Sequence, residues 1–200
     1  MKPESSLLPI TVIAAIALFM IKEVVEWIRR HRNENRTKAA LRTLLAYECE
    51  RNNWALKTLQ SIFETVLSER AENQKTIFEV FFPKNGRITF KYLNPDSGSA
   101  GSSPLPEVHR DTMSKQLLGV AIADPKLYTL LQSAFDATGE LEHLRVSIIH
   151  IADPQDDEVF GGDFEGLADY GLEELARSYV QLDALYRECT GKRLEGHRMR

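Results

Sequence analysis

Cysteine is scarce in this sequence, and the motifs that identify most catalytic sites are missing. The two cysteines, Cys49 and Cys189, lie far apart and form no Cys-x-x-Cys pair. This usage favours a reducing compartment and two reduced, buried thiols, with one disulfide between them as the alternative. The chain also contains no nucleophile elbow, no glycine-rich nucleotide turn and no cysteine–histidine pairing signal. We therefore expect neither an enzyme nor a bound cofactor.

The sequence has no strong excess of charge of one sign. Its 25 Lys and Arg residues against 29 Asp and Glu residues leave a net charge of -4, which argues against nucleic acid as a partner. The charges are unevenly placed, because residues 22–51 carry eight Lys and Arg against five Glu, whereas residues 151–176 carry nine acids and no Lys or Arg. With 200 residues, 43% of them hydrophobic, the chain is long enough for one ordinary domain with appendages.

Two local patterns resemble metal sites but are incomplete. The acidic residues 153–165 do not fit an EF-hand calcium loop, which needs Gly at its sixth position and Glu at its twelfth. A loop that begins at Asp153 or at Asp156 does not place both residues at these positions. Glu140 and His143 have the Glu-x-x-His spacing of di-iron bundles, but a second such pair is missing. We expect no metal, and a metal or phosphoryl-accepting site around Glu140 and His143 is the alternative function.

A long uncharged apolar run lies at the N-terminus, from Leu7 to Ile21. Fifteen helical residues span about 22 Å, and the apolar residues beyond Lys22 extend the run toward the roughly 30 Å of a bilayer core. No small-residue cleavage site follows it, which argues against a signal peptide. The sequence predicts an extracytoplasmic tail over residues 1–6 and a transmembrane helix with an interfacial extension over residues 7–28.

Basic residues follow this run rather than precede it. The positive-inside bias therefore places the N-terminus outside and the C-terminal domain in the cytoplasm, with the chain in the cell inner (plasma) membrane. The basic segment over residues 29–36 is expected to contact anionic headgroups, and a solvated, charged helix face is the alternative for its outer half. The residues expected at the membrane interface are Lys22, Trp27, Arg29, Arg30 and Arg32.

Helical periodicity dominates the rest of the chain. Apolar stripes and capping residues predict helices over residues 37–68 and 107–122, then one from the Asp124-Pro125 cap, and a last helix ending at Gly191. The fold class is thus mainly α, with an N-terminal transmembrane helix followed by a cytosolic helical bundle.

The predicted bundle contains a β-hairpin insertion. Residues 76–93 change to an alternating apolar pattern around Asn85-Gly86, a dipeptide that favours a tight turn. The Gly- and Ser-rich residues 94–104 then predict a flexible loop. The cytosolic domain spans residues 29–190 in this interpretation, and residues 191–200 form a basic tail.

Two polar residues, Glu48 and Asn52, interrupt the apolar stripe of the helix over residues 37–68. Burying an unpaired carboxylate is costly, so this polar patch needs partners. We expect it to be buried and to fix the register and pairing of helices. A surface that faces a partner and a ligand-binding role are the alternatives. The candidate partners within the chain are Tyr179, Tyr186, Arg145 and His143.

Leu44, Leu45, Glu48 and Asn52 also form a Leu-Leu-x-x-Glu-x-x-x-Asn pattern behind the apolar and basic segments. In this layout, residues 5–70 resemble a loose group of uncharacterised bacterial single-pass membrane proteins. The resemblance implies an N-terminal anchor and a helical cytosolic domain but no activity. We therefore expect a membrane-anchored, non-enzymatic interaction or sensing module. Its expected partners are the lipid bilayer and a protein partner or second copy of the chain, without nucleic acid or a small-molecule substrate.

Overall fold

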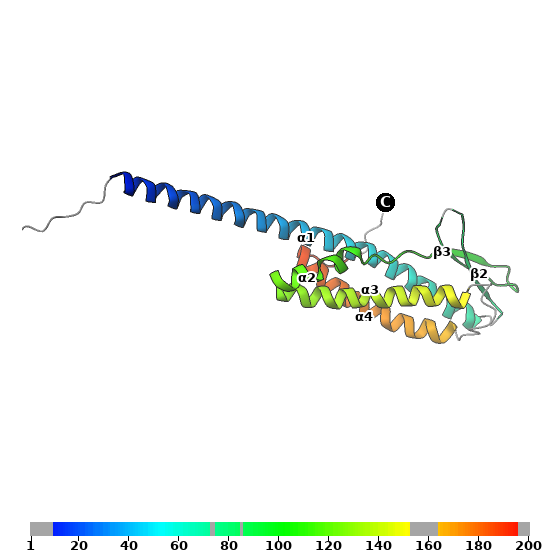
Figure 1. The fold of residues 1–200 in the computed structure, drawn as a ribbon. Coiled ribbons are helices and arrows are strands. Elements are labelled where there is room, and N and C mark those ends of the chain that lie inside the picture. Colours follow the sequence, from blue (N-terminus) through cyan, green and yellow to red (C-terminus); the bar gives the residue numbers. More distant parts are fainter. Residues whose placement is uncertain (1–9, 73–74, 85, 153–163, 196–200) are drawn as a thin grey trace, which may run out of the picture. The chain divides into compact units, whose positions relative to one another are not determined.

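The computed structural model describes residues 10–72, 75–84, 86–152 and 164–195, and this part of the chain is mainly helical with one small sheet (Figure 1). A mainly α fold is therefore confirmed. The chain divides after Arg42, within its first helix, into two compact units. The elements in chain order are α1 (Ile10–Glu72), β1 (Ile77–Phe81), β2 (Thr89–Leu93), β3 (Ala100–Pro104), α2 (Asp111–Ala123), α3 (Pro125–Ala152) and α4 (Phe164–Thr190).

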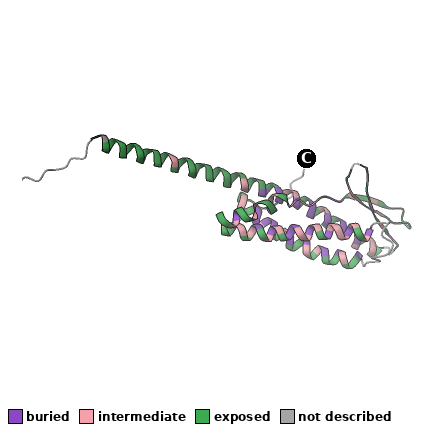
Figure 2. Ribbon diagram, in the orientation of Figure 1, coloured by how far each residue is buried: buried purple, intermediate pink, exposed green. Residues whose placement is uncertain are grey.

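The first unit contains the N-terminal part of α1, whose apolar side chains are exposed (Figure 2). No helix in the described residues is long and apolar enough to cross a membrane. The described part of the chain therefore does not support the predicted transmembrane helix over residues 7–28. Lys22, Glu23 and Glu26 interrupt the apolar run, and residues 7–9 lie outside the described part.

Helix α1 is continuous where two separate helices were expected. Arginine and glutamate, which favour helix, make up most of residues 29–36, and local side-chain contacts hold the weaker helix formers among them. Asn35 Nδ2 lies 3.1 Å from His31 Nε2, and Thr37 Oγ1 donates to Asn33 O at 3.0 Å. The helix predicted over residues 37–68 therefore begins earlier and is continuous with the helical segment predicted before it.

The second unit buries the apolar stripes of α1, α3 and α4 against one another (Figure 2). On α3, Asp124 caps the first turn, because its Oδ1 accepts from Leu127 N at 3.1 Å, as predicted. The predicted stripe of this helix is buried except at Leu130, where its neighbour Leu131 is buried instead. The α1–α4 approach is close enough that a Cβ at Gly171 would collide with the Phe63 ring. The largest fully buried side chains of the three helices include Leu45, Leu59, Ile62, Phe63, Leu131, Leu141, Leu144, Leu175 and Leu182.

The sheet has three antiparallel strands in the order β1-β2-β3, one more than the predicted hairpin. The prediction of a flexible loop over residues 94–104 is therefore wrong for residues 100–104, which form β3. Asn94 Oδ1 accepts from Asp96 N and Ser97 N, both at 3.1 Å, and turns the chain back. β3 then pairs with β2 although Gly and Ser have low β propensity, because β2 offers it an open backbone edge.

Aromatic rings join the sheet to the helices. Phe78 on β1 and Phe90 on β2 stack with centroids 5.8 Å apart, and Phe164 at the start of α4 meets Phe78 edge-on at 5.3 Å. Gly86, with φ +77°, lies in the turn between β1 and β2, while Asn85 lies outside the described residues. The sheet thereby packs on one end of the helical domain.

Candidate functional site

The buried carboxylate of Glu48 caps helix α2 from a different helix. Its Oε1 accepts from Thr112 N at 2.9 Å and its Oε2 accepts from Met113 N at 2.7 Å. These N–H groups belong to the first turn of α2, which has no side-chain cap of its own. Burial raises the pKa of Glu48, and the two backbone hydrogen bonds oppose that rise. The predicted burial of Glu48 is confirmed by its exposed fraction of 4%.

Asn52 holds the residue that leads into the same helix. Its Nδ2 donates to His109 O at 2.6 Å, and its Oδ1 accepts from His109 N at 2.8 Å. The amide is fully buried and satisfies both backbone groups of His109. Glu48 and Asn52 together therefore fix residues 109–113 against α1.

The partners of this polar patch differ from the expected ones. Glu48 and Asn52 bind backbone groups of residues 109–113. No hydrogen bond to Glu48 or Asn52 from the four candidate side chains is seen in the described residues, and three of the four bind elsewhere. Tyr186 OH donates to Glu50 Oε1 at 2.8 Å, Tyr179 OH donates to Leu194 O at 2.9 Å, and Arg145 pairs with Glu142. Within the described residues, the patch therefore fixes a segment of its own chain, and a role in pairing with another chain stays a prediction.

A cavity next to the patch gathers arginines from three parts of the fold, and we name it the arginine cavity. Its volume is about 450 Å³. Arg51 comes from α1, Arg87 from the turn before β2, and Arg145 from α3. Trp54, Glu107 and His109 also line it.

Charges of both signs act on His109 in the arginine cavity. The pKa of His109 is lowered by burial and by the charge of Arg51, against the opposite effect of Glu107 and Asp111. Arg145 Nη1 pairs with Glu142 Oε1 at 3.1 Å. Among the described residues, the buried Nε atoms of Arg51 and Arg145 have no hydrogen-bond partner. Two of the arginines that line the cavity therefore carry a buried donor that the described part of the fold does not satisfy.

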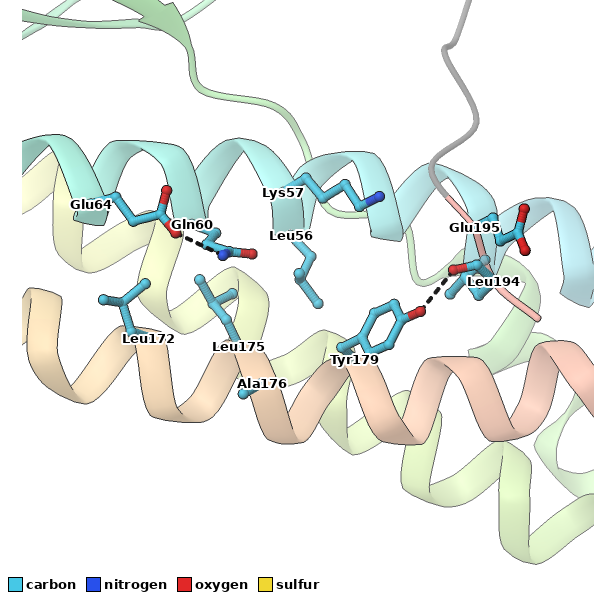
Figure 3. Close-up of a pocket in the computed structure, with 10 residues that line it drawn as sticks. All are labelled: Leu56, Lys57, Gln60, Glu64, Leu172, Leu175, Ala176, Tyr179, Leu194 and Glu195. Atoms are coloured by element: carbon cyan, nitrogen blue, oxygen red, sulfur yellow. Dashed lines mark hydrogen bonds between the residues drawn. The ribbon is translucent and has the colours of Figure 1, made fainter.

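A second cavity, a groove of about 640 Å³, lies between α1 and α4 (Figure 3). Leu56 on α1 faces Leu175 and Tyr179 on α4, and the C-terminal segment closes one end (Figure 3). Leu194 is buried there. Its N–H donates to Asp183 Oδ1 at 2.7 Å, and its carbonyl oxygen accepts from Tyr179 OH, so two side chains of α4 hold the segment. The predicted basic tail over residues 191–200 thus begins with a packed segment, and residues 196–200 lie outside the described part.

The residues predicted for the membrane interface lie on the exposed surface of α1 in the first unit. Glu26 lies within 3.8 Å of Lys22 Nζ and 3.6 Å of Arg30 Nη2, one turn away on each side. Trp27 stacks on His31 with ring centroids 5.7 Å apart. The interface residues thereby form a polar and aromatic zone directly after the apolar run. Its remaining members, Arg29 and Arg32, are also exposed.

Glu140 and His143 gain no further metal ligands in the part of the chain that the structure describes. His143 is exposed and Glu140 is half-buried on α3. No group of three or more His, Cys, Asp and Glu side chains in the described ranges is placed to hold a metal ion. Of the acidic residues 153–165, those from 153 to 163 lie outside the described residues.

The two cysteines are thiols that no disulfide joins. Cys49 is fully buried on α1, and burial holds the pKa of its thiol well above the ordinary value. A thiol in this state is a weak nucleophile, because the thiolate is the reactive form. The predicted burial is confirmed for Cys49 and is wrong for Cys189, which is half-buried on α4.

The arginine cavity was not predicted, because Arg51, Arg87 and Arg145 are far apart in sequence. A single local signal was available, the spacing of three between Arg51 and Trp54, which places both side chains on one helical face. The sequence matches no family model, and it shows no significant similarity to a curated protein or to a solved structure.

Proposed function

We propose that this chain is a membrane-anchored, non-enzymatic interaction or sensing module with its helical domain in the cytoplasm. The observation that carries the proposal is the exposure of large apolar side chains along the start of α1. Leu18 is 67% exposed, Phe19 59% and Ile21 60%. An exposed apolar surface of this kind is typical of a segment that a bilayer or another protein covers.

The residues that follow the apolar run support a bilayer as the covering phase. Lys22 and Arg30 have long side chains that extend to the headgroup region while their aliphatic parts stay in contact with lipid. Trp27, 66% exposed, is suited to the membrane interface. We propose that residues 7–28 insert, with the N-terminus outside and the basic residues on the cytoplasmic side.

The helical domain supports a role in interaction rather than catalysis. Its buried polar side chains, Glu48 and Asn52, bind backbone groups and thereby shape the fold. Leu118 and Ile122 on α2 are 76% and 81% exposed and lie one turn apart. This apolar pair suits contact with a protein partner or a second copy of the chain.

Extraction of cell membranes with alkaline carbonate tests the anchor. We expect the native full-length chain to stay in the membrane pellet, and the double variant Ile16→Asp/Phe19→Asp to move to the supernatant. Charged side chains at these positions raise the free energy of insertion. Val180→Asp is the matched control, because Val180 is an apolar residue on α4 that is 65% exposed. Complete extraction of the native chain would contradict the proposal.

Labelling with a membrane-impermeant thiol reagent in intact cells tests the orientation. A cysteine placed at Ser5 should react, and one placed at Ser99 should not. The native chain measures the background labelling of its own two thiols, Cys49 and Cys189. Labelling at Ser99 but not at Ser5 would reverse the proposed topology.

A further inference from the structure

The arginine cavity brings together three positively charged side chains that are far apart in sequence. Arg51, Arg87 and Arg145 line it from three elements, and Glu107 is the acid among the lining residues. Glu142 pairs with Arg145 at one guanidinium nitrogen. An arginine does not lose its proton in a protein, so the positive charge persists at every physiological pH.

Two of these arginines, Arg51 and Arg145, have a donor that the described part of the fold does not use. Arg51 Cζ lies 5.8 Å from the centroid of the Tyr47 ring, a cation–π contact. The Nε atoms of Arg51 and Arg145 are buried, and neither has a hydrogen-bond partner among the described residues. A buried donor without a partner is unfavourable, and an oxyanion is the acceptor that best matches a guanidinium.

The walls of the cavity favour an organic anion over a bare ion. Trp54 is 36% exposed and presents an aromatic surface, and Ile88 and Pro106 add apolar surface. The volume of about 450 Å³ lies within the range of small-molecule sites. Apolar walls with a few converging polar groups are the usual composition of such sites.

We propose that the arginine cavity binds a small organic anion. Its phosphate or carboxylate group lies among Arg51, Arg87 and Arg145, and its apolar part lies against Trp54. This goes beyond the proposed function, because it gives the sensing module a ligand and does not depend on membrane attachment. It also departs from the expectation that no small molecule binds.

Trp54 provides a direct reporter, because Trp27 is the other of the two tryptophans. The full chain with Trp27→Phe is kept in a maltoside detergent, which carries no phosphate or carboxylate, and is titrated at constant ionic strength. The probes are phenyl phosphate, phenylacetate and inorganic phosphate. We expect saturable changes in Trp54 emission with at least one of the two aromatic anions. The aromatic anion with the lower Kd identifies the preferred acid group. A higher Kd for inorganic phosphate than for phenyl phosphate shows the contribution of the apolar wall.

Arginine-to-glutamine substitutions inside and outside the cavity show where the anion binds. Arg51→Gln, Arg87→Gln and Arg145→Gln should each raise the Kd about tenfold or more, because each removes a charge-assisted donor. Glu107→Gln should lower the Kd, because it removes a competing carboxylate. Arg177→Gln is the control for net charge, since Arg177 is exposed on α4 and pairs with Glu173 and Glu174. It should leave the Kd unchanged.

Arg87→Gln keeps the test decisive if Arg145→Gln does not fold, because Arg87 is exposed in a turn. Circular dichroism of every variant checks that the helices are retained. Three results would overturn the proposal: no saturable change with any probe, equal weakening by Arg177→Gln, or affinities that none of the three cavity arginines alters.

Discussion

The side-chain amide of Asn52 binds both backbone groups of His109, in the way that one β-strand pairs with another. The donor–acceptor distances are 2.6 Å to the carbonyl oxygen and 2.8 Å from the amide nitrogen. One turn earlier on α1, Glu48 accepts from the first N–H groups of α2. A polar patch in an apolar stripe thus connects α1 to residues 109–113, which are 57 or more positions away in sequence.

Asn52→Ala should destabilise the protein by about 1–3 kcal/mol, because it leaves two part-buried backbone groups of His109 without partners. Chemical unfolding of the full chain in detergent, followed by Trp54 fluorescence, measures the change. Asn35→Ala is the matched control on the exposed part of α1, and its effect should stay within about 0.5 kcal/mol. Equal effects of the two substitutions would show that the bonds to His109 contribute nothing.

The pH dependence of stability should carry a signature of Glu48. Burial raises the pKa of this carboxyl in the folded state above its ordinary value of 4.5. Between these two pKa values, the folded state therefore binds more protons than the unfolded state. The contribution of Glu48 to the free energy of unfolding is fully present below pH 4.5 and is lost as the pH rises through the pKa of the folded state.

Glu48→Gln removes this titration while keeping the size of the side chain. The free energy of unfolding of the native chain, minus that of Glu48→Gln, should decrease as the pH rises through that window. Unfolding by urea at a series of pH values measures the difference, in which the titration of Asp111 and the other carboxyls largely cancels. A difference that increases with pH would mean that the two backbone hydrogen bonds outweigh burial.

The elements that follow from local patterns could be predicted from the sequence. The stripes of α3 and α4 and the Asp124 cap depend on residues close together in the chain. The burial of Glu48 and Asn52 followed from their place in the stripe. Their partners could not be predicted, because backbone N–H groups are present at almost every residue and carry no sequence signal.

Strand β3 and the arginine cavity escaped prediction for a related reason. β3 is formed from Ala, Gly, Ser and Pro, whose intrinsic preferences oppose a strand, and its stability comes from pairing with β2. A Cβ at Gly101 would collide with the Tyr92 ring on β2, so this strand needs a glycine opposite that ring. The arginine cavity depends on the meeting of three distant segments, which only the tertiary structure provides.

The packed C-terminal segment gives a further prediction. Leu194 is 1% exposed, so Leu194→Ala should lower the free energy of unfolding by about 2 kcal/mol or more through lost burial and the cavity it leaves. Arg193→Ala, at the exposed neighbouring position, should change it by less than about 0.5 kcal/mol. Thermal unfolding of the two variants side by side decides the matter. If both are neutral, the segment is not part of the folded core.

The final prediction concerns the contact between α1 and α4. Gly171 is buried, and a Cβ there would collide with the ring of Phe63, which is itself fully buried. Gly171→Ala should therefore destabilise the protein by about 1–3 kcal/mol, although alanine favours helix more than glycine does.

Gly119→Ala on α2 is the control, because its new Cβ would meet only Gln116 Oε1 at 4.0 Å, and it should stabilise by about 0.5–1 kcal/mol. Phe63→Leu should reduce the penalty of Gly171→Ala in a double-mutant cycle, since it removes the colliding ring atoms. Stabilisation by both alanine substitutions, measured by urea unfolding, would mean that α1 and α4 are not in close contact at this point.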